Sequence, residues 1–196
     1  MSRLAWIAPT ALFLPLLSPP AVPAPAPAAK TYKIDSVHSS ALFRILHNNA
    51  SYFYGRFTDI SGTVVYDEAN PAGSSVEVTI QADSVATGNG KRDEHLKSPD
   101  FFNAGEFPVL SFKSKGVKKG SGKGEFEVTG DLTIHGVTKP LTTKVVHTGT
   151  GQGRGGEVAG FETTFTIKRT DFDMKHMVGP LGEEVQVTIS LEGEKQ

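Results

Sequence analysis

The stretch FEVTGDLTIHGVTKPLTTKVVH, residues 126–147, decides the fold because its apolar residues recur at alternate positions. A turn is expected at residues 135–140, where Gly and Pro interrupt the pattern. Such a period of two places alternate side chains on one face of a β-strand. The intervening residues are mostly Thr, Glu, Asp or Lys, and strands with one dry and one wet face are typical of antiparallel sheets. The recurring residues are Phe126, Val128, Leu132 and Ile134 before the turn, and Leu141, Val145 and His147 after it.

The same alternation extends over the chain from Thr31 onward. Turn signals also occur at residues 70–73, 118–124 and 149–156, and such short connections indicate that consecutive strands are neighbours. Eight or nine such strands must close or stack, because open sheet edges pair with other chains, and we expect closure into a barrel. The further alternating sets are Ala41, Phe43, Ile45 and His47; Val76, Val78, Ile80 and Ala82; Leu110 and Phe112; Phe161, Phe165 and Ile167; and Val185, Val187, Ile189 and Leu191.

The first 28 residues have the pattern of a secretory signal peptide. Arg3 precedes an apolar run at residues 4–17, and small residues follow at 24–29, which predicts cleavage near Ala28 or Ala29. The run is shorter than the roughly 20 residues of a membrane-spanning helix and contains two prolines, so an uncleaved anchor is the less favoured alternative. We therefore expect a periplasmic or secreted protein with no stable membrane span. Residues 30–196 are expected to form a single domain.

Composition excludes some classes of partner and bond. The chain has no cysteine, so neither a disulfide nor a lipid-modified cysteine can form. Its formal charge is −1, with lysines scattered among acidic residues, whereas a nucleic-acid partner requires a basic face. We expect no nucleic-acid partner.

The segment RDEHLKSPDFFNAGEFP, residues 92–108, is the one stretch with clear helical character, and we expect a short helix near residues 91–98. Asp93 and His95 are two positions apart, which points their side chains in divergent directions on a helix, and no second histidine is near in sequence. We therefore predict no metal site. We expect Arg92 and His95 to hydrogen-bond loop backbone, while three phenylalanines plug an apolar opening: Phe101, Phe102 and Phe107.

Motifs of catalysis are not supported. The run GQGRGG, residues 151–156, matches a dinucleotide-binding pattern, but strand-like residues follow where a helix is required, so we interpret it as a loop. A G-x-S-x-G nucleophile signature is absent from the sequence. We predict no catalytic residues and no cofactor.

Three segments together resemble motifs of the YceI family of exported lipid-binding barrels, over about residues 32–191. They are IDSVHSSALFRILH (34–47), RDEHLKSPDFF (92–102) and GDLTIHGVTKPLT (130–142). The chain departs from the family pattern in two places. NNASYFYGRF (48–57) is more aromatic than expected, and Asp173 stands where glycine is usual.

The resemblance implies an all-β, lipocalin-like fold: an extended eight-stranded antiparallel up-and-down barrel that carries or sequesters a polyisoprenoid or similar long-chain amphiphile. Small residues on the inward faces, taken as Ala41, Ala82, Gly130 and Gly160, leave room for it. The alternatives are an enzyme acting on an amphiphile and a ligand-free structural or stress-response barrel, and a homodimer remains open. The residues predicted to line the pocket are Phe43, Ile45, Phe53, Phe57, Val78, Ile80, Phe101, Phe102, Leu110, Phe112, Phe126 and Phe165.

Overall fold

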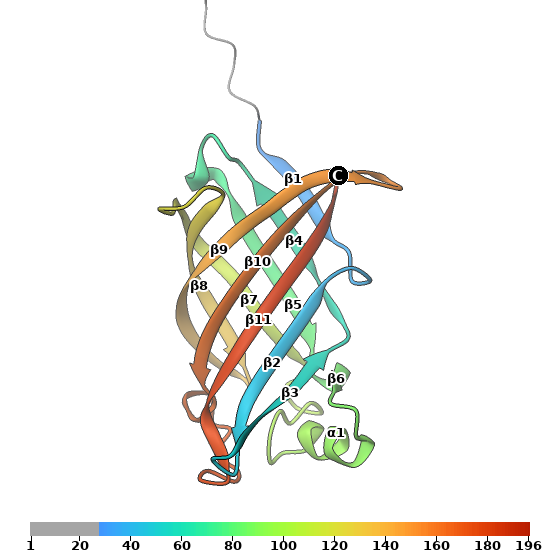
Figure 1. Ribbon diagram of the computed structural model, residues 1–196, viewed down its shortest axis with the longest axis vertical. Helices are drawn as coiled ribbons and strands as arrows, with labels where there is room; N and C mark the ends of the chain where they lie inside the picture. The colour runs from blue at the N-terminus through green and yellow to red at the C-terminus, as the bar shows by residue number, and fades with distance from the viewer. Residues whose placement is uncertain (1–27) are drawn as a thin grey trace, which may run out of the picture.

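A computed structural model describes residues 28–196, so all but the last residue of the expected signal peptide lies outside the described part (Figure 1). Within it, one α-helix, α1 (Gly90–Lys97), lies beside one end of a β-barrel. The strands are β1 (Lys30–Ile34), β2 (Ser40–His47), β3 (Ser51–Phe57), β4 (Ile60–Tyr66), β5 (Ser75–Gln81), β6 (Val85–Ala86), β7 (Val109–Lys119), β8 (Glu125–Ile134), β9 (Val137–Gly153), β10 (Gly156–Lys168) and β11 (Leu181–Lys195).

The eleven segments form eight barrel strands, because three strands are each broken once. β1 and β2 are two parts of one barrel strand, because both pair with β11. β4, which pairs with β1, and β3, which pairs with β2, form the next strand. β5, which pairs with β4, and β6, which pairs with β3, form the third. From β5 the pairing runs through β7, β8, β9 and β10 to β11, with every pair antiparallel. The prediction of a closed eight-stranded up-and-down barrel is confirmed.

Two expected turns are shorter than the sequence suggested. The turn after β8 contains only His135 and Gly136, and Pro140 lies within β9 opposite Asp131. The run at 149–156 was predicted to be a loop, but β9 continues to Gly153 and only residues 154–155 form the turn. Alternating glycines do not prevent pairing here, because β10 and β11 supply a long template on one side of this ribbon.

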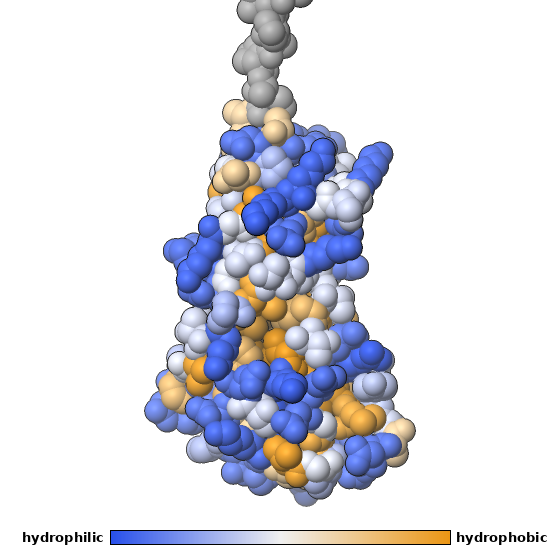
Figure 2. All heavy atoms as spheres, turned by 90° about the vertical axis from the view of Figure 1, so that its left-hand side faces the viewer, coloured by the Kyte–Doolittle hydropathy of each residue, from blue (hydrophilic) through white to orange (hydrophobic). Residues whose placement is uncertain are grey.

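The barrel wall divides between β9 and β10 in the half nearer α1. Their pairing ends at Val145 opposite Thr163; beyond that point β9 pairs with β8 and β10 with β11. Pro140 lies in this part of β9, where a residue without an amide hydrogen is tolerated because one edge has no strand partner. On the corresponding side of the molecule, Figure 2 shows apolar atoms in a recess at mid-height between hydrophilic regions.

The segment between β6 and β7, residues 87–108, covers the barrel beside β3, whose pairing with β6 is limited to two residues. We call residues 90–108 the lid segment. Its helix begins after Asn89, whose side chain accepts a hydrogen bond from the amide of Arg92 at 3.1 Å. The predicted helix near 91–98 is thus confirmed, one residue displaced.

Arg169 fixes the loop between β10 and β11 at the same end. Its guanidinium is buried and donates to four backbone carbonyls, with distances of 2.6–3.2 Å. Asp173 has a left-handed φ of 60° in this loop, a conformation that Asp tolerates better than most residues and that explains why glycine suits the position. The carbonyls belong to Met174, His176, Leu181 and Gly182.

Replacing Arg169 by Met should lower the free energy of unfolding by at least about 2 kcal/mol, because a buried carbonyl without a donor costs roughly 1–3 kcal/mol. Urea denaturation measures this change. Arg154→Met is the matched control, because Arg154 is exposed in the turn between β9 and β10. Equal stability of the two variants would contradict the assigned role.

Candidate ligand-binding cavity

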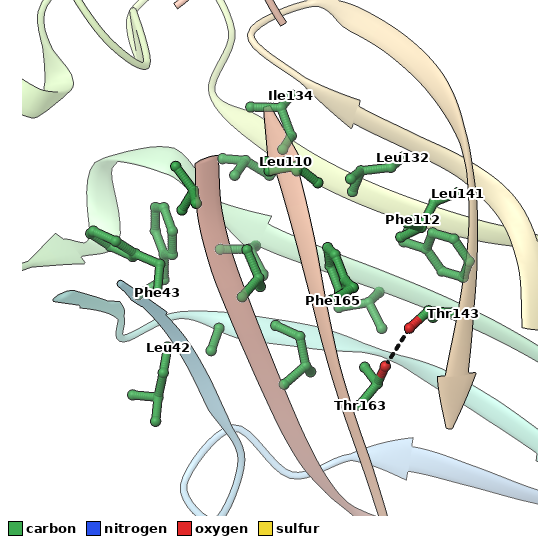
Figure 3. A pocket seen from close by; sticks show the side chains of 18 of the residues that line it. Leu42, Phe43, Leu110, Phe112, Leu132, Ile134, Leu141, Thr143, Thr163 and Phe165 are labelled. Atoms are coloured by element: carbon green, nitrogen blue, oxygen red, sulfur yellow. Dashed lines mark hydrogen bonds between the residues drawn. The ribbon is translucent and has the colours of Figure 1, made fainter. Parts of the chain in front are cut away.

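The barrel strands surround an elongated cavity of about 450 Å³, within the usual range of about 300–1,000 Å³ for ligand pockets. Its wall is almost entirely apolar (Figure 3). All twelve residues predicted to line a pocket lie along this wall: Phe43, Ile45, Phe53, Phe57, Val78, Ile80, Phe101, Phe102, Leu110, Phe112, Phe126 and Phe165. Their contact with a ligand remains a prediction.

Inward-facing glycines let two cavity phenylalanines lie close to the wall. A Cβ added at Gly55 would lie within 2.8 Å of three ring atoms of Phe43, its cross-strand partner. A Cβ at Gly130 would lie 2.3 Å from the backbone oxygen of Lys113 and 2.6 Å from Cζ of Phe112. Each ring therefore occupies the volume that a side chain on the neighbouring strand would take, and this leaves space along the barrel axis. Sequence reasoning identified Gly130 but missed Gly55.

The other small residues contribute differently from what the sequence suggested. Ala41 lines the cavity, whereas Ala82 is buried in a 3-10 turn outside it. Gly160 does not face inward, because its neighbours Ala159 and Phe161 are the buried pair and alternate residues of a strand share a face.

Aromatic rings close the end of the cavity away from the lid segment. Tyr66 contacts Phe126 and Phe161 with ring centroids 5.7 and 5.4 Å apart, and Tyr32 contacts Phe161 at 6.3 Å. Tyr32 donates a hydrogen bond of 2.7 Å to Glu157. Burial and this carboxylate raise the pKa of the Tyr32 hydroxyl. The tyrosines were missed at the sequence level, although "TYKI" and "ISGTVVY" alternate as strands.

Two phenylalanines of the lid segment close the opposite end. Phe101 is buried, and Phe102 contacts Phe57 of β3 with ring centroids 5.3 Å apart; both line the cavity. Phe107, in contrast, does not line it. Its ring packs on His135 at 4.9 Å and above Gly136, so Phe107 attaches the segment to the turn between β8 and β9.

The charged residues of the lid segment are partly placed as expected. Arg92 donates to the carbonyl of Thr87 at 3.0 Å, which is the predicted backbone bond, and its guanidinium lies over the ring of Phe53. His95 does not bond backbone; its Nε2 donates to Asp100 at 2.9 Å. This hydrogen bond lowers the pKa of the Asp100 carboxyl. Asp100 was not identified from the sequence as a partner of His95, because the chain reverses after Lys97.

Polar groups within the cavity wall are satisfied where β9 and β10 separate. Thr143 and Thr163 hydrogen-bond each other at 2.8 Å, as the dashed line in Figure 3 shows, and Thr163 also donates to the carbonyl of Lys144. The basic side chains that line the cavity at the lid end are His47, Arg92, His95 and Arg169. The cavity thus combines a long apolar interior with a polar rim at one end.

Comparison with known proteins agrees with this architecture. Residues 32–193 match a family model described as a YceI-like domain. The protein YceI of Escherichia coli O157:H7 is similar to the chain, with 45% identity over 171 residues that cover 86% of this chain and 88% of that protein.

Two solved structures have a similar fold. BcnA of Burkholderia cenocepacia has a TM-score of 0.74 and 24% identity, covering 82% of this chain and 99% of its own. A polyisoprenoid binding domain from Saccharophagus degradans has a TM-score of 0.64 and 19% identity, covering 84% of this chain and 98% of its own.

Replacing Phe101 and Phe102 together by Ala should accelerate release of a dansyl-labelled prenol bound in the cavity, because two rings that close one end are removed. We expect dissociation to change more than association. Stopped-flow fluorescence measures both rates. Phe172→Ala is the control, because Phe172 is buried but does not line the cavity. Release that is equally fast in the control and the double variant would show that these rings act only through stability.

Replacing Gly55 by Ala should displace the Phe43 ring into the cavity. We expect the dissociation constant of the same probe to rise about tenfold, equivalent to about 1.4 kcal/mol, with overpacking lowering stability by about 1–3 kcal/mol. Fluorescence titration and thermal melts provide the two values. Gly151→Ala is the matched strand control, since its Cβ would meet no atom closer than 3.8 Å. Unchanged affinity in Gly55→Ala would contradict the assigned position of the Phe43 ring.

Proposed function

This chain belongs to the YceI-like family, and on that premise we propose that it is an exported protein that carries or sequesters a polyisoprenoid or similar long-chain amphiphile without altering it covalently. The observation that carries the proposal is the elongated apolar cavity. The neighbour described as a polyisoprenoid binding domain supports the same class of ligand. Transfer of each methylene from water to such an interior contributes about 0.8 kcal/mol, so a long tail binds through its length.

The two ends of the cavity support an amphiphile over a plain hydrocarbon. The aromatic cluster around Tyr66 closes one end, and the other carries Arg92, His95 and Arg169. A polar head group at the lid end would stay near water and near these basic side chains while the tail extends toward Tyr66. The lid segment would then open for the ligand to enter and leave.

The alternatives receive less support. A purely structural barrel is expected to fill its interior with side chains, whereas here Gly55 and Gly130 keep two rings against the wall and the interior remains open. An enzyme that works through a covalent intermediate places a nucleophile beside a base. Among residues 28–196, the side chains hydrogen-bonded to histidines are Asp35, Tyr66, Asp100 and Thr150. The two hydroxyls in this set, those of Tyr66 and Thr150, both bond His147, whose side chain does not line the cavity, so the cavity suits binding better than catalysis.

Export rests on the signal-peptide pattern of residues 1–28 and places the protein in the periplasm or outside the cell. The described residues include no helix that is long and apolar enough to cross a membrane.

Native mass spectrometry of the protein purified from its own host tests both export and lipid carriage. We expect a mature chain that begins near Ala29 or Lys30, together with a stoichiometric, solvent-extractable lipid of unchanged mass after incubation with the protein. Retention of Met1 would contradict export. A lipid-free protein that also fails to bind a prenol would contradict carriage, and conversion of the extracted lipid would favour the enzyme.

A further inference from the structure

The geometry points to a binding site for a divalent transition-metal ion of the zinc class, formed by His95, Asp100 and His176 at the lid end of the barrel. One imidazole nitrogen from each histidine and one carboxylate oxygen all lie within 4.8 Å of one another. No ion is present in the structure. This proposal departs from the expectation of no metal site, which considered only ligands near His95 in sequence; the fold brings the second histidine from a loop 81 positions away.

The three ligands are close to the spacing that a metal requires. His95 Nε2 lies 2.9 Å from Asp100 Oδ2, and His176 Nδ1 lies 3.8 Å from Asp100 Oδ1. Zinc bonds of about 2.0–2.2 Å at tetrahedral angles place neighbouring ligand atoms about 3.3–3.6 Å apart. Side-chain rotations that shift the ligand atoms by roughly an ångström therefore convert the hydrogen-bonded cluster into a three-ligand site, with a fourth position left for water.

Neighbouring groups hold the two imidazoles in place. The ring of Phe101 makes edge contacts with both, with centroids 5.0 Å from His95 and 5.3 Å from His176. Arg169 donates to the backbone carbonyl of His176 at 2.8 Å, which fixes that side of the cluster. The three side chains are between 37% and 51% exposed, so an ion can reach them.

Ligand type decides the class of ion. Two imidazoles and one carboxylate suit Zn²⁺, Cu²⁺ or Ni²⁺, whereas Ca²⁺ and Mg²⁺ require mainly oxygen ligands. A second cluster of similar spacing, Asp35, His38 and Glu192, offers only one imidazole. That cluster is a natural internal control.

The position of the metal site links ion binding to closure of the cavity. His95 and Asp100 belong to the lid segment, and His176 belongs to the loop that Arg169 anchors. A bound ion would join the two and restrain the lid segment next to Phe101, which closes the cavity. This consequence, slower release of ligand, rests on the proposed function; the metal site itself does not.

Isothermal titration of the lipid-free mature protein with ZnCl₂ tests the site. We expect one saturable site, and a loss of affinity of at least about tenfold in His95→Gln and in His176→Gln, since removing even an outer-shell partner of a ligand weakens metal binding about 10–100-fold. Asp100→Asn should weaken it as well. His38→Gln should bind as the unmodified chain does. Circular dichroism melts confirm that the variants are folded.

Release of the dansyl-labelled prenol, with and without ZnCl₂, tests whether a bound ion restrains the lid segment. Zinc should slow release several-fold in the unmodified chain and leave release from His176→Gln unchanged. Absence of saturable zinc binding, or binding that survives both histidine substitutions, would contradict the proposed metal site. Release unaffected by bound zinc would contradict the proposed restraint of the lid segment. Failure of the proposed function appears separately, as absence of prenol uptake in metal-free protein.

Discussion

Backbone hydrogen bonds between β1 and β11 join the two ends of the sheet, with Tyr32 opposite Lys195 and Ile34 opposite Gly193. Closure makes the two faces of every strand different, because one meets water and the other meets only the opposite wall. Gly193 permits the seam to close around the tyrosine, since a Cβ there would lie 2.8 Å from Cβ of Tyr32. The apolar interior, the aromatic end and the need for a lid all depend on this closed ring.

A closed ring of eight strands can fill its interior with side chains or leave a cavity. In this protein the packing of a few wall residues leaves a cavity. Phe43 and Phe112 lie against glycines and leave the axis free. β9 and β10 separate between Val145 and the start of β9, and there Thr143 and Thr163 bond each other and expose no unsatisfied hydroxyl to the cavity. The same wall therefore supplies stability through burial near Tyr66 and space for a ligand toward the lid segment.

Alternation in the sequence predicted the strands, and it explains why strand residues such as Phe43 and Val78 lie on the cavity wall, because a period of two determines which face each strand residue occupies. Phe101 and Phe102 lie in the lid segment and follow no strand pattern, although they also line the cavity. Contact of the twelve chosen residues with a ligand stays a prediction. Other features depend on tertiary contacts. Local sequence does not show that Gly55 faces Phe43. It also does not show that Pro140 can lie in a strand because β10 is not paired with that part of β9. His176 was overlooked as a neighbour of His95 for the same reason: their contact follows from closure and from the Arg169 anchor.

The central claim is that the cavity holds one long apolar chain. A crystal structure of the protein purified from its own host, without delipidation, tests this most directly. The account predicts continuous non-protein electron density along the cavity, from the rings of Tyr66 and Phe126 to Phe101 and Phe102. A cavity filled by rearranged side chains, or occupied only by ordered water in fully native protein, would contradict it.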